Sequence, residues 1–419
     1  MKFHSFLGAL ALAVATPLFA APQGDEPIAV PQTVKQGIDF VYVDPQLSNV
    51  ARRYQRPTNW LARAFGGRRS NQPNILFSRL AEGLEDYRMS WGRLPQLKIP
   101  AGPALSRGST GKRVALLRTR LGLPAGGPYD ARVAGLVSSY QQIHGLVPAD
   151  GIAGNATIAS LNRGATYYER KVAVNMERAF RLPRTGTFRR YALVDAGAAE
   201  VYLVERDRIA DGMRVIVGSP EHETPMMAVL MRDVRVNPYW NVPGEMARTF
   251  TAPRVLNQGL SYLTDFHYEV LSDWTADART VDPAKIDWKK VAAGKSDIRV
   301  RQLPGPWNSM GAMKFEMPND YGIYLHDTPK KGLFAERNRW ISNGCIRLED
   351  YRRFASWFFG DVPEGRSGTE ELVELPEPAP VFMTYFTVAP WGDGLQFRPD
   401  PYKFDDRAIQ QMFGSGGNA

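Results

Sequence analysis

The sequence predicts a multidomain α+β protein, in which a helical N-terminal half precedes a mainly β domain. Three observations support this prediction. The chain has 419 residues, which is too many for a single core of ordinary size. Apolar residues recur at helical spacing in the first part of the chain and at alternate positions after about residue 190. The strand pattern then breaks at 244–300, which predicts a capping subdomain inserted into the β domain.

The first twenty residues have the pattern of an export signal. Lys2 gives a short cationic start, an apolar run spans 6–18, and small residues follow at Ala20 and Ala21. We therefore expect residues 1–20 to be a signal peptide. An N-terminal anchor is the less favoured alternative, because the run is short for a membrane span and no basic cluster flanks it. No other segment approaches spanning length, so the mature chain is expected to contain no membrane segment.

The composition limits the classes of partner. The formal net charge is +9, which favours polyanionic or carboxylate-bearing partners. A mildly basic surface that only keeps the protein soluble explains the same charge equally well. No nucleic-acid-binding motif occurs in the sequence, so nucleic acid is not expected as a partner, and no oligomeric state is implied.

Residues 21–107 are expected to form a helical scaffold region. Apolar side chains recur there at helical spacing, at Leu76, Leu80, Leu84 and Tyr87. A further scaffold helix is expected in 163–190, where a helical pattern stops at Pro183.

Residues 108–162 are expected to form a compact three-helix module. Two of its helices have apolar faces, which comprise Val114, Leu117 and Leu121 in one and Val133, Val137 and Tyr140 in the other. The second helix leads into His144, which we interpret as a helix-end residue and not as a ligand. An Asp-Gly-x-x-Gly pattern and a threonine follow at 150–157.

The mainly β domain is expected to span 191–390, with a tail at 391–419. Strand patterns occur at 191–194, 200–204, 213–217, 313–315, 321–325 and 381–388. The break at 244–300 precedes the last three of these strands. A lid over a binding cleft and a purely structural elaboration are both compatible with that position.

Cys345 is the only cysteine in the sequence, and His326 lies nineteen positions before it. A lone cysteine forms no intramolecular disulfide, although export would place it in an oxidising compartment where structural cysteines occur in pairs. A thiol between a glycine turn and Arg347, with a histidine upstream, is typical of an activated nucleophile. No metal is implied, because none of the five histidines is closely paired with another.

The sequence around Cys345 suggests how the thiol is activated. His326 is expected at the end of a strand, on the face opposite Ile323 and Leu325. The helical spacing after Cys345 predicts a helix that begins directly behind it, so that the helix dipole favours the thiolate. Arg347 adds a positive charge that can stabilise the thiolate or receive a substrate carboxylate. A buried structural cysteine is the alternative, and the Asn-Gly before it and the arginine behind it disfavour that interpretation.

The residues from 321 to 348 resemble the signature of the L,D-transpeptidase catalytic domain, found in thiol enzymes that remodel bacterial peptidoglycan. The resemblance is carried by His-Asp-Thr-Pro at 326–329 and Ser-x-Gly-Cys-x-Arg at 342–347. Weaker similarity to the long Gram-negative members extends over about 75–405. The 108–162 module resembles a small peptidoglycan-binding module of wall enzymes, and a generic three-helix bundle is its alternative.

The resemblance implies roles for ten residues and a location in the periplasm. Cys345 is implied as nucleophile and His326 as base, with oxyanion or support roles at Ser342, Asn343, Gly344 and Asp327. Substrate binding is implied for Tyr324, Asn308, Lys314 and Arg347. Many family members have histidine or serine at the position of Asn343, so the group that orients His326 is left open between the Asp327 carbonyl, Ser342 and Asn343.

The implied reaction is acyl transfer from stem tetrapeptides of peptidoglycan through a Cys345 thioester, which gives 3→3 cross-links without a cofactor. Two alternatives stay open. Water as acceptor would make the same site an L,D-carboxypeptidase or an endopeptidase, and the module alone would make a non-catalytic wall-binding protein. A papain-like protease is disfavoured, because that family places its cysteine before its histidine.

Overall fold

The computed structural model describes residues 40–43, 74–365 and 368–414. The expected signal peptide, and the part of the expected scaffold before residue 74 other than 40–43, lie outside the described residues. Contacts divide the chain into two units, of which one is Asn241–Gln302 and the other comprises the rest of the described residues. No helix in the described ranges is long and apolar enough to cross a membrane.

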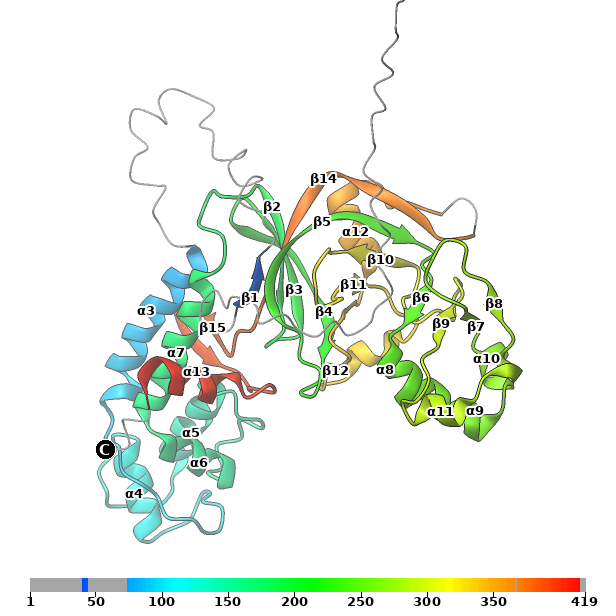
Figure 1. Ribbon diagram of the computed structural model, residues 1–419. Helices are drawn as coiled ribbons and strands as arrows, with labels where there is room; N and C mark the ends of the chain where they lie inside the picture. Colours follow the sequence, from blue (N-terminus) through cyan, green and yellow to red (C-terminus); the bar gives the residue numbers. More distant parts are fainter. Residues whose placement is uncertain (1–39, 44–73, 366–367, 415–419) are drawn as a thin grey trace, which may run out of the picture. The chain divides into compact units, whose positions relative to one another are not determined.

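The scaffold helices of the larger unit follow the predicted apolar pattern. They are α3 (Ile75–Met89), η2 (Trp91–Arg93), α7 (Ala165–Phe180) and α13 (Phe404–Phe413). Asn74 caps α3 by accepting a hydrogen bond from the Phe77 N–H, and the helix buries Leu80, Leu84 and Tyr87 as expected. Figure 1 shows α7 packed against both α3 and α13, so the last helix of the chain lies beside an early one.

Three helices between the scaffold elements enclose a cluster of their own. They are α4 (Lys112–Arg120), α5 (Ala131–Ile143) and α6 (Asn155–Arg163). The buried Gln141 side chain donates hydrogen bonds to Ile152 O and Thr157 Oγ1 and accepts one from Gly151 N–H. The glycine-rich turn predicted at 150–157 is therefore held by α5. His144 is the C-cap of α5, as expected for a helix-end residue. Wall binding by these helices stays a prediction.

In the described residues, ten strands form one sheet in the order β1-β5-β10-β11-β13-β4-β3-β2-β14, with β12 beside β4. The strands are β1 (Phe40–Val43), β2 (Arg190–Asp195), β3 (Glu200–Glu205), β4 (Arg208–Gly218), β5 (Met226–Val236), β10 (Met313–Glu316), β11 (Leu325–His326), β12 (Trp340–Ser342), β13 (Ile346–Leu348) and β14 (Glu371–Thr384). β14 pairs with both β2 and β5, so the sheet closes on itself. A separate hairpin consists of β15 (Val388–Trp391) and β16 (Gly394–Phe397).

Two strand predictions in this domain need correction. Residues 321–324 are not in a strand, because the Asn319 side chain bonds Ile323 O, Tyr321 N–H and Ile323 N–H and bends the chain there. The strand expected at 381–388 ends at Thr384 and resumes at Val388. The N–H of Thr387 in the gap bonds to the Asn175 side chain of α7 in place of a strand partner.

The unit Asn241–Gln302 contains short helices and a small sheet of its own. Its elements are β6 (Trp240–Val242), α8 (Gly244–Met246), η3 (Ala247–Thr251), α9 (Ala252–Gln258), α10 (Ser261–Asp265), β7 (Tyr268–Leu271), β8 (Thr280–Val281), η4 (Pro283–Lys285), α11 (Trp288–Ala292) and β9 (Arg299–Gln302). The strand order is β6-β9-β7-β8. Trp288 is buried inside the unit, and its indole N–H donates to Pro283 O at 2.9 Å. The break in the strand pattern therefore corresponds to a separately packed insertion, and its capping role stays a prediction.

Candidate active site

The strand register places His326 and Cys345 on one face of the sheet. β11 runs parallel to β13 with His326 opposite Arg347, and antiparallel to β10 with Lys314 opposite His326. Residues in register on neighbouring strands project to the same face, and so do residues two apart on one strand. The Ile346 N–H continues the pairing to Tyr324 O at 3.0 Å. Cys345 directly precedes β13, two positions before Arg347, so it lies at the end of the strand that pairs with the strand of His326.

The His326 imidazole is buried and its tautomer is fixed. Its Nδ1 lies within hydrogen-bonding distance of the backbone carbonyl of Asp327. A carbonyl oxygen only accepts, so Nδ1 carries the proton and Nε2 has the lone pair. Of the three orienting groups left open by the sequence, the Asp327 carbonyl is the one that the structure places against the ring.

Burial lowers the pKa of His326 to about 3, and the positive charges of Arg347 and Lys314 act in the same direction. Hydrogen bonds to the backbone of Asp327 and of Met310 oppose the shift but do not outweigh it. The ring is therefore neutral at pH 7, which is the state in which an imidazole accepts a proton from a thiol.

The turn before Cys345 is held by hydrogen bonds on both sides. Gly344 has φ +106°, in the region that favours glycine, and a Cβ there would lie 3.0 Å from Ile323 Cδ1. Ser342 Oγ donates to Cys345 O at 2.7 Å and accepts from Gly344 N–H at 3.2 Å. The resemblance implies an oxyanion or support role for Gly344, and the hydrogen bond from its N–H to Ser342 favours the support role. Ser342 supports the turn, and Cys345 Sγ lies 3.6 Å from Gly322 O.

The helix expected directly after Cys345 begins later, so its dipole does not act on the thiolate. Ile346 and Leu348 are buried in strand β13. The helix α12 (Tyr351–Phe359) starts six residues after Cys345, and Asp350 caps it by accepting from Arg353 N–H. Asp350 is thus outside the helix, and Glu349 precedes it. Sheet pairing with β4 and β11 determines the conformation of these residues in place of the helical spacing.

Arg347 provides the positive charge near the thiol. Burial lowers the pKa of its guanidinium, and the negative charge of the Cys345 thiolate acts in the opposite direction. Because this interaction is mutual, Arg347 favours the ionised thiol. In the part of the chain that the structure describes, no carboxylate forms an ion pair with Arg347, so its charge is available to an anionic group of a substrate.

Asp327 positions the surroundings of His326 through its carboxylate. Its Oδ2 accepts from Ala312 N–H at 2.9 Å, and Lys331 Nζ bonds to its Oδ1 at 2.6 Å. Lys331 also donates to Glu349 O at 2.8 Å. The loop after β11 is therefore tied to the turn before β10 and to the end of β13.

The three remaining predicted substrate contacts differ in exposure. Asn308 is fully buried and its amide donates to Pro238 O and Leu303 O, while its Oδ1 accepts from Met310 N–H. The structure therefore corrects its implied substrate-binding role to a structural one. Tyr324 is also buried, with Lys314 Nζ 4.0 Å from its ring centre. Lys314 pairs with Glu316 at 3.2 Å and is less available to a substrate than Arg347.

Two residues of the site were not predicted from the sequence. Thr224 Oγ1 donates to Gly344 O at 2.7 Å and accepts from Gly218 N–H at 2.9 Å. The Tyr402 hydroxyl donates to Gly218 O at 2.7 Å. Both residues stand in stretches that resemble the family, but no spacing rule connects positions so far apart in the chain. Among residues 40–43, 74–365 and 368–414, no cluster of His, Cys, Asp or Glu side chains is suited to hold a metal ion.

Comparison with known sequences finds similarity to one family of enzymes. Residues 189–375 match the family model of the YkuD L,D-transpeptidase catalytic domain. A Haemophilus influenzae protein, whose name assigns it provisionally to the L,D-transpeptidases, is 35% identical over 200 residues. The match covers 46% of this chain and 40% of that protein, so this chain spans well under half the length of its curated relative.

Several similar solved structures are of L,D-transpeptidases. The enzyme from Mycobacterium smegmatis is 14% identical, with a TM-score of 0.22, and the match covers 46% of this chain and 58% of that one. The domain from Xylanimonas cellulosilytica is 16% identical, with a TM-score of 0.20, and the match covers 68% and 98%. At these TM-scores the structural matches carry no argument, and the similarity to the L,D-transpeptidase catalytic domain rests on the sequence comparisons.

Proposed function

We propose that this chain is a cysteine L,D-transpeptidase that forms 3→3 cross-links in peptidoglycan, because residues 189–375 match the family model of the YkuD L,D-transpeptidase catalytic domain. The observation that carries the proposal is the placement of Cys345 and a neutral, Nδ1-protonated His326 on one face of the sheet. Arg347 beside them favours a thiolate nucleophile. We also propose that the chain works in the periplasm after removal of residues 1–20.

The first half-reaction forms a thioester. The Cys345 thiol gives its proton to His326 Nε2, and the sulfur attacks the carbonyl carbon of the third residue of a stem tetrapeptide. The bond to the terminal D-alanine then breaks, and its amine leaves with the proton from His326. Arg347 is suited to bind a carboxylate of the donor stem, because no carboxylate of the described residues pairs with it.

The second half-reaction releases the thiol. The side-chain amine of a diaminopimelate in a neighbouring stem attacks the thioester carbonyl and gives a proton to His326. The carbon–sulfur bond breaks and the thiolate recovers a proton. Water in place of the amine would give a shortened stem, which is the carboxypeptidase alternative. An amine acceptor that no charged group holds in the site would compete poorly with water. Because Arg347 is assigned to the donor stem, its charge alone favours neither transfer nor hydrolysis.

A product analysis separates transfer from hydrolysis. The purified protein is incubated with disaccharide tetrapeptides in water enriched in oxygen-18, and the products are weighed by mass spectrometry. Transfer gives dimers that have lost one D-alanine and contain no label. Hydrolysis gives labelled monomers that have lost D-alanine. If neither the wild-type protein nor Cys345→Ala gives any product, only the wall-binding alternative is left.

We also propose that helices α4–α6 form a wall-binding module and that the inserted unit forms a cap. Pelleting with purified peptidoglycan sacculi tests the module, with Cys345→Ala used to prevent covalent capture. Hydrogen exchange tests the cap, because a gating segment at 244–300 should exchange faster than β2–β4 and slow after acylation by a β-lactam. A structural insertion would exchange equally in both states.

A further inference from the structure

A chain of buried hydrogen bonds connects the C-terminal segment to the turn that carries Cys345. We propose that Tyr402 is a positioning residue, whose hydroxyl holds the Gly344–Cys345 turn through Gly218 and Thr224 and thereby controls the reactivity of the thiol. This inference rests on the proposed function, because it names a residue that controls the reactivity of Cys345, the proposed nucleophile.

The contacts nearest the thiol pass through Thr224. The Tyr402 hydroxyl donates to Gly218 O at 2.7 Å and accepts from Thr224 N–H at 3.4 Å. Thr224 Oγ1 then donates to Gly344 O at 2.7 Å. Tyr402 and Thr224 are 3% and 1% exposed, so water does not replace these bonds.

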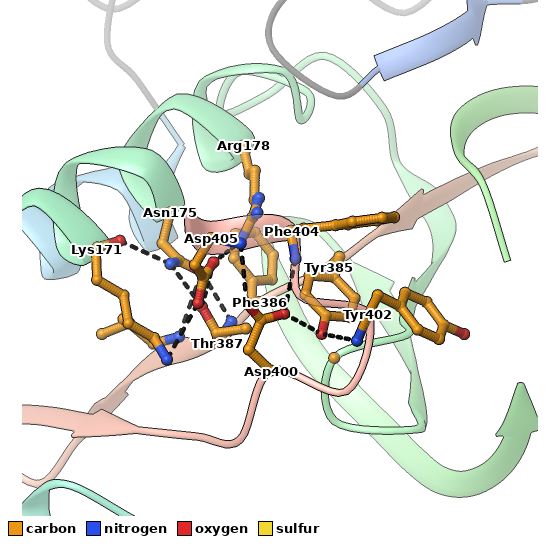
Figure 2. A network of polar contacts seen from close by, with 12 residues as sticks. Lys171, Asn175, Arg178, Tyr385, Phe386, Thr387, Asp400, Tyr402, Phe404 and Asp405 are labelled. Carbon is orange, nitrogen blue, oxygen red and sulfur yellow. Dashed lines mark hydrogen bonds and ion pairs between the residues drawn. The ribbon is translucent and has the colours of Figure 1, made fainter. Parts of the chain in front are cut away.

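Tyr402 is itself held on both its ring and its backbone. Its ring stacks on Tyr385, with centres 5.0 Å apart and planes 15° apart. Its N–H donates to the Tyr385 hydroxyl at 3.0 Å, and that hydroxyl donates to Asp400 Oδ1 at 2.6 Å. Asp400 also accepts the backbone N–H groups of Phe404 and Asp405, as Figure 2 shows.

An ion cluster fixes the far end of the segment to α7. Asp405 is fully buried and pairs with Arg178 at 2.8 Å and Lys171 at 3.1 Å. Thr387 Oγ1 adds a hydrogen bond to the same carboxylate at 3.0 Å. Burial alone would raise the pKa of Asp405, but the two cations outweigh it and lower the pKa, so the carboxylate is charged at neutral pH. Figure 2 shows these groups converging on Asp405 from α7 and from the strand ends.

The turn at Gly344 is the part of the site that most needs such a support. A glycine in the left-handed region has little intrinsic preference for one conformation, so contacts from outside the turn determine where the next residue lies. Ser342 holds the turn from within, whereas Thr224 holds it from another loop. Small displacements of a nucleophile cost large factors in rate, on the order of 10²-fold for about 1 Å. Tyr402 can therefore affect the rate without touching the substrate.

The test compares Tyr402→Phe with a matched control, Tyr129→Phe. Tyr129 is also buried, its hydroxyl also donates to a glycine carbonyl at 2.7 Å, and burial raises the pKa of both phenols to about 12. Both variants lose one hydroxyl and should lose similar stability in thermal unfolding. Only Tyr402→Phe should slow acylation of Cys345 by a carbapenem, about 10–100-fold, and shift the pH profile of its alkylation by iodoacetamide. KM for a tetrapeptide donor should stay within about twofold, with the loss in kcat.

A double-mutant cycle tests the route through Thr224. Thr224→Val should reproduce the loss of Tyr402→Phe, Thr224→Ser should restore the wild-type rates, and the double variant should be no slower than the slower single variant. Additive losses, or a Tyr402→Phe alkylation profile equal to that of Tyr129→Phe, would overturn the inference. Alkylation requires no turnover. A wild-type protein without transpeptidase activity would therefore refute the proposed function and leave the role of Tyr402 to be decided by the alkylation profiles.

Discussion

Two buried histidines in this molecule have the same titration behaviour and different surroundings. His144 and His326 are 6% and 2% exposed, and the Nδ1 of each faces a backbone carbonyl, Tyr140 O and Asp327 O respectively. Burial lowers the pKa of both to about 3. A strongly lowered histidine pKa therefore does not by itself identify the catalytic residue.

The neighbours make the difference between the two rings. His144 stacks against Tyr140, with ring centres 3.7 Å apart, and its Nε2 lies 3.2 Å from the Tyr87 hydroxyl. Since Nδ1 donates to a carbonyl, Nε2 of His144 accepts from Tyr87, and its lone pair is already used. Cations act on both rings, Arg120 and Lys171 on His144 and Arg347 and Lys314 on His326. What His326 has in addition is Cys345, which directly precedes the strand paired with its own. A perturbed histidine pKa indicates function where a reactive partner accompanies it.

The largest expected effect on activity comes from removing Cys345, the reactive partner of His326. Cys345→Ala should abolish labelling of the protein by a thiol reagent and all turnover, because the chain has no other sulfhydryl. The site would then resemble the surroundings of His144, a buried imidazole without a nucleophile. Circular dichroism and thermal unfolding should match the wild type, which separates lost chemistry from lost fold. Cross-linked product from this variant would exclude a thioester mechanism at Cys345.

The next effect contrasts the two histidines directly. His326→Ala should lower the rate on the order of 10²–10⁴-fold, as expected for loss of a general acid–base. His144→Phe should leave the rate near that of the wild type and lower stability by about 1–3 kcal/mol, because the Tyr87 hydroxyl loses its buried partner. Steady-state kinetics and urea unfolding of both variants check this. A large loss of rate in His144→Phe, or none in His326→Ala, would reverse the assignment.

Residues whose chemistry is local can be proposed from the sequence alone. A single cysteine, a glycine turn and an upstream histidine predict the Cys345–His326 pair, and the end of a helical pattern predicts the position of His144. The helix after Cys345 was misplaced because residues 346–348 fit either period, and pairing with strands distant in sequence decides between them. Asn308 looks like a polar ligand in sequence, yet it turns inward to satisfy the backbone of its own loop. Thr224 and Tyr402 depend on contacts that only the closed sheet creates.

The third prediction concerns the pH dependence of stability. Both histidines have folded-state pKa values of about 3, below the value of 6.5 expected when unfolded. Only the unfolded chain gains their protons as pH falls from 6.5 toward 3, so this stabilisation is present above 6.5 and is lost on acidification. Each histidine should account for about 2 kcal/mol of the loss between pH 7.5 and pH 5.0.

Urea unfolding of His144→Phe and of the wild type at pH 7.5 and pH 5.0 tests the contribution of His144. The variant should lose about 2 kcal/mol less than the wild type over that interval, because one of the two neutral imidazoles is gone. The carboxylates are common to both proteins and cancel in the comparison. An equal loss in the two proteins would mean that His144 takes up a proton in the folded state despite its burial.

The smallest effect is expected at Asn343, where many members of the family carry a histidine or serine. Asn343 is exposed, its amide does not titrate, and the imidazole of His326 is oriented by Asp327 instead. Asn343→Ala should therefore reduce the rate by less than about threefold, within the range of surface substitutions. Its neighbour Ser342 gives the matched comparison, since Ser342→Ala removes both hydrogen bonds that hold the turn from within. We expect Ser342→Ala to be the slower of the two in acylation by a carbapenem. A loss of rate in Asn343→Ala as large as that in His326→Ala would assign Asn343 an orienting or oxyanion role. The surroundings that distinguish His326 from His144 would then include Asn343 as well.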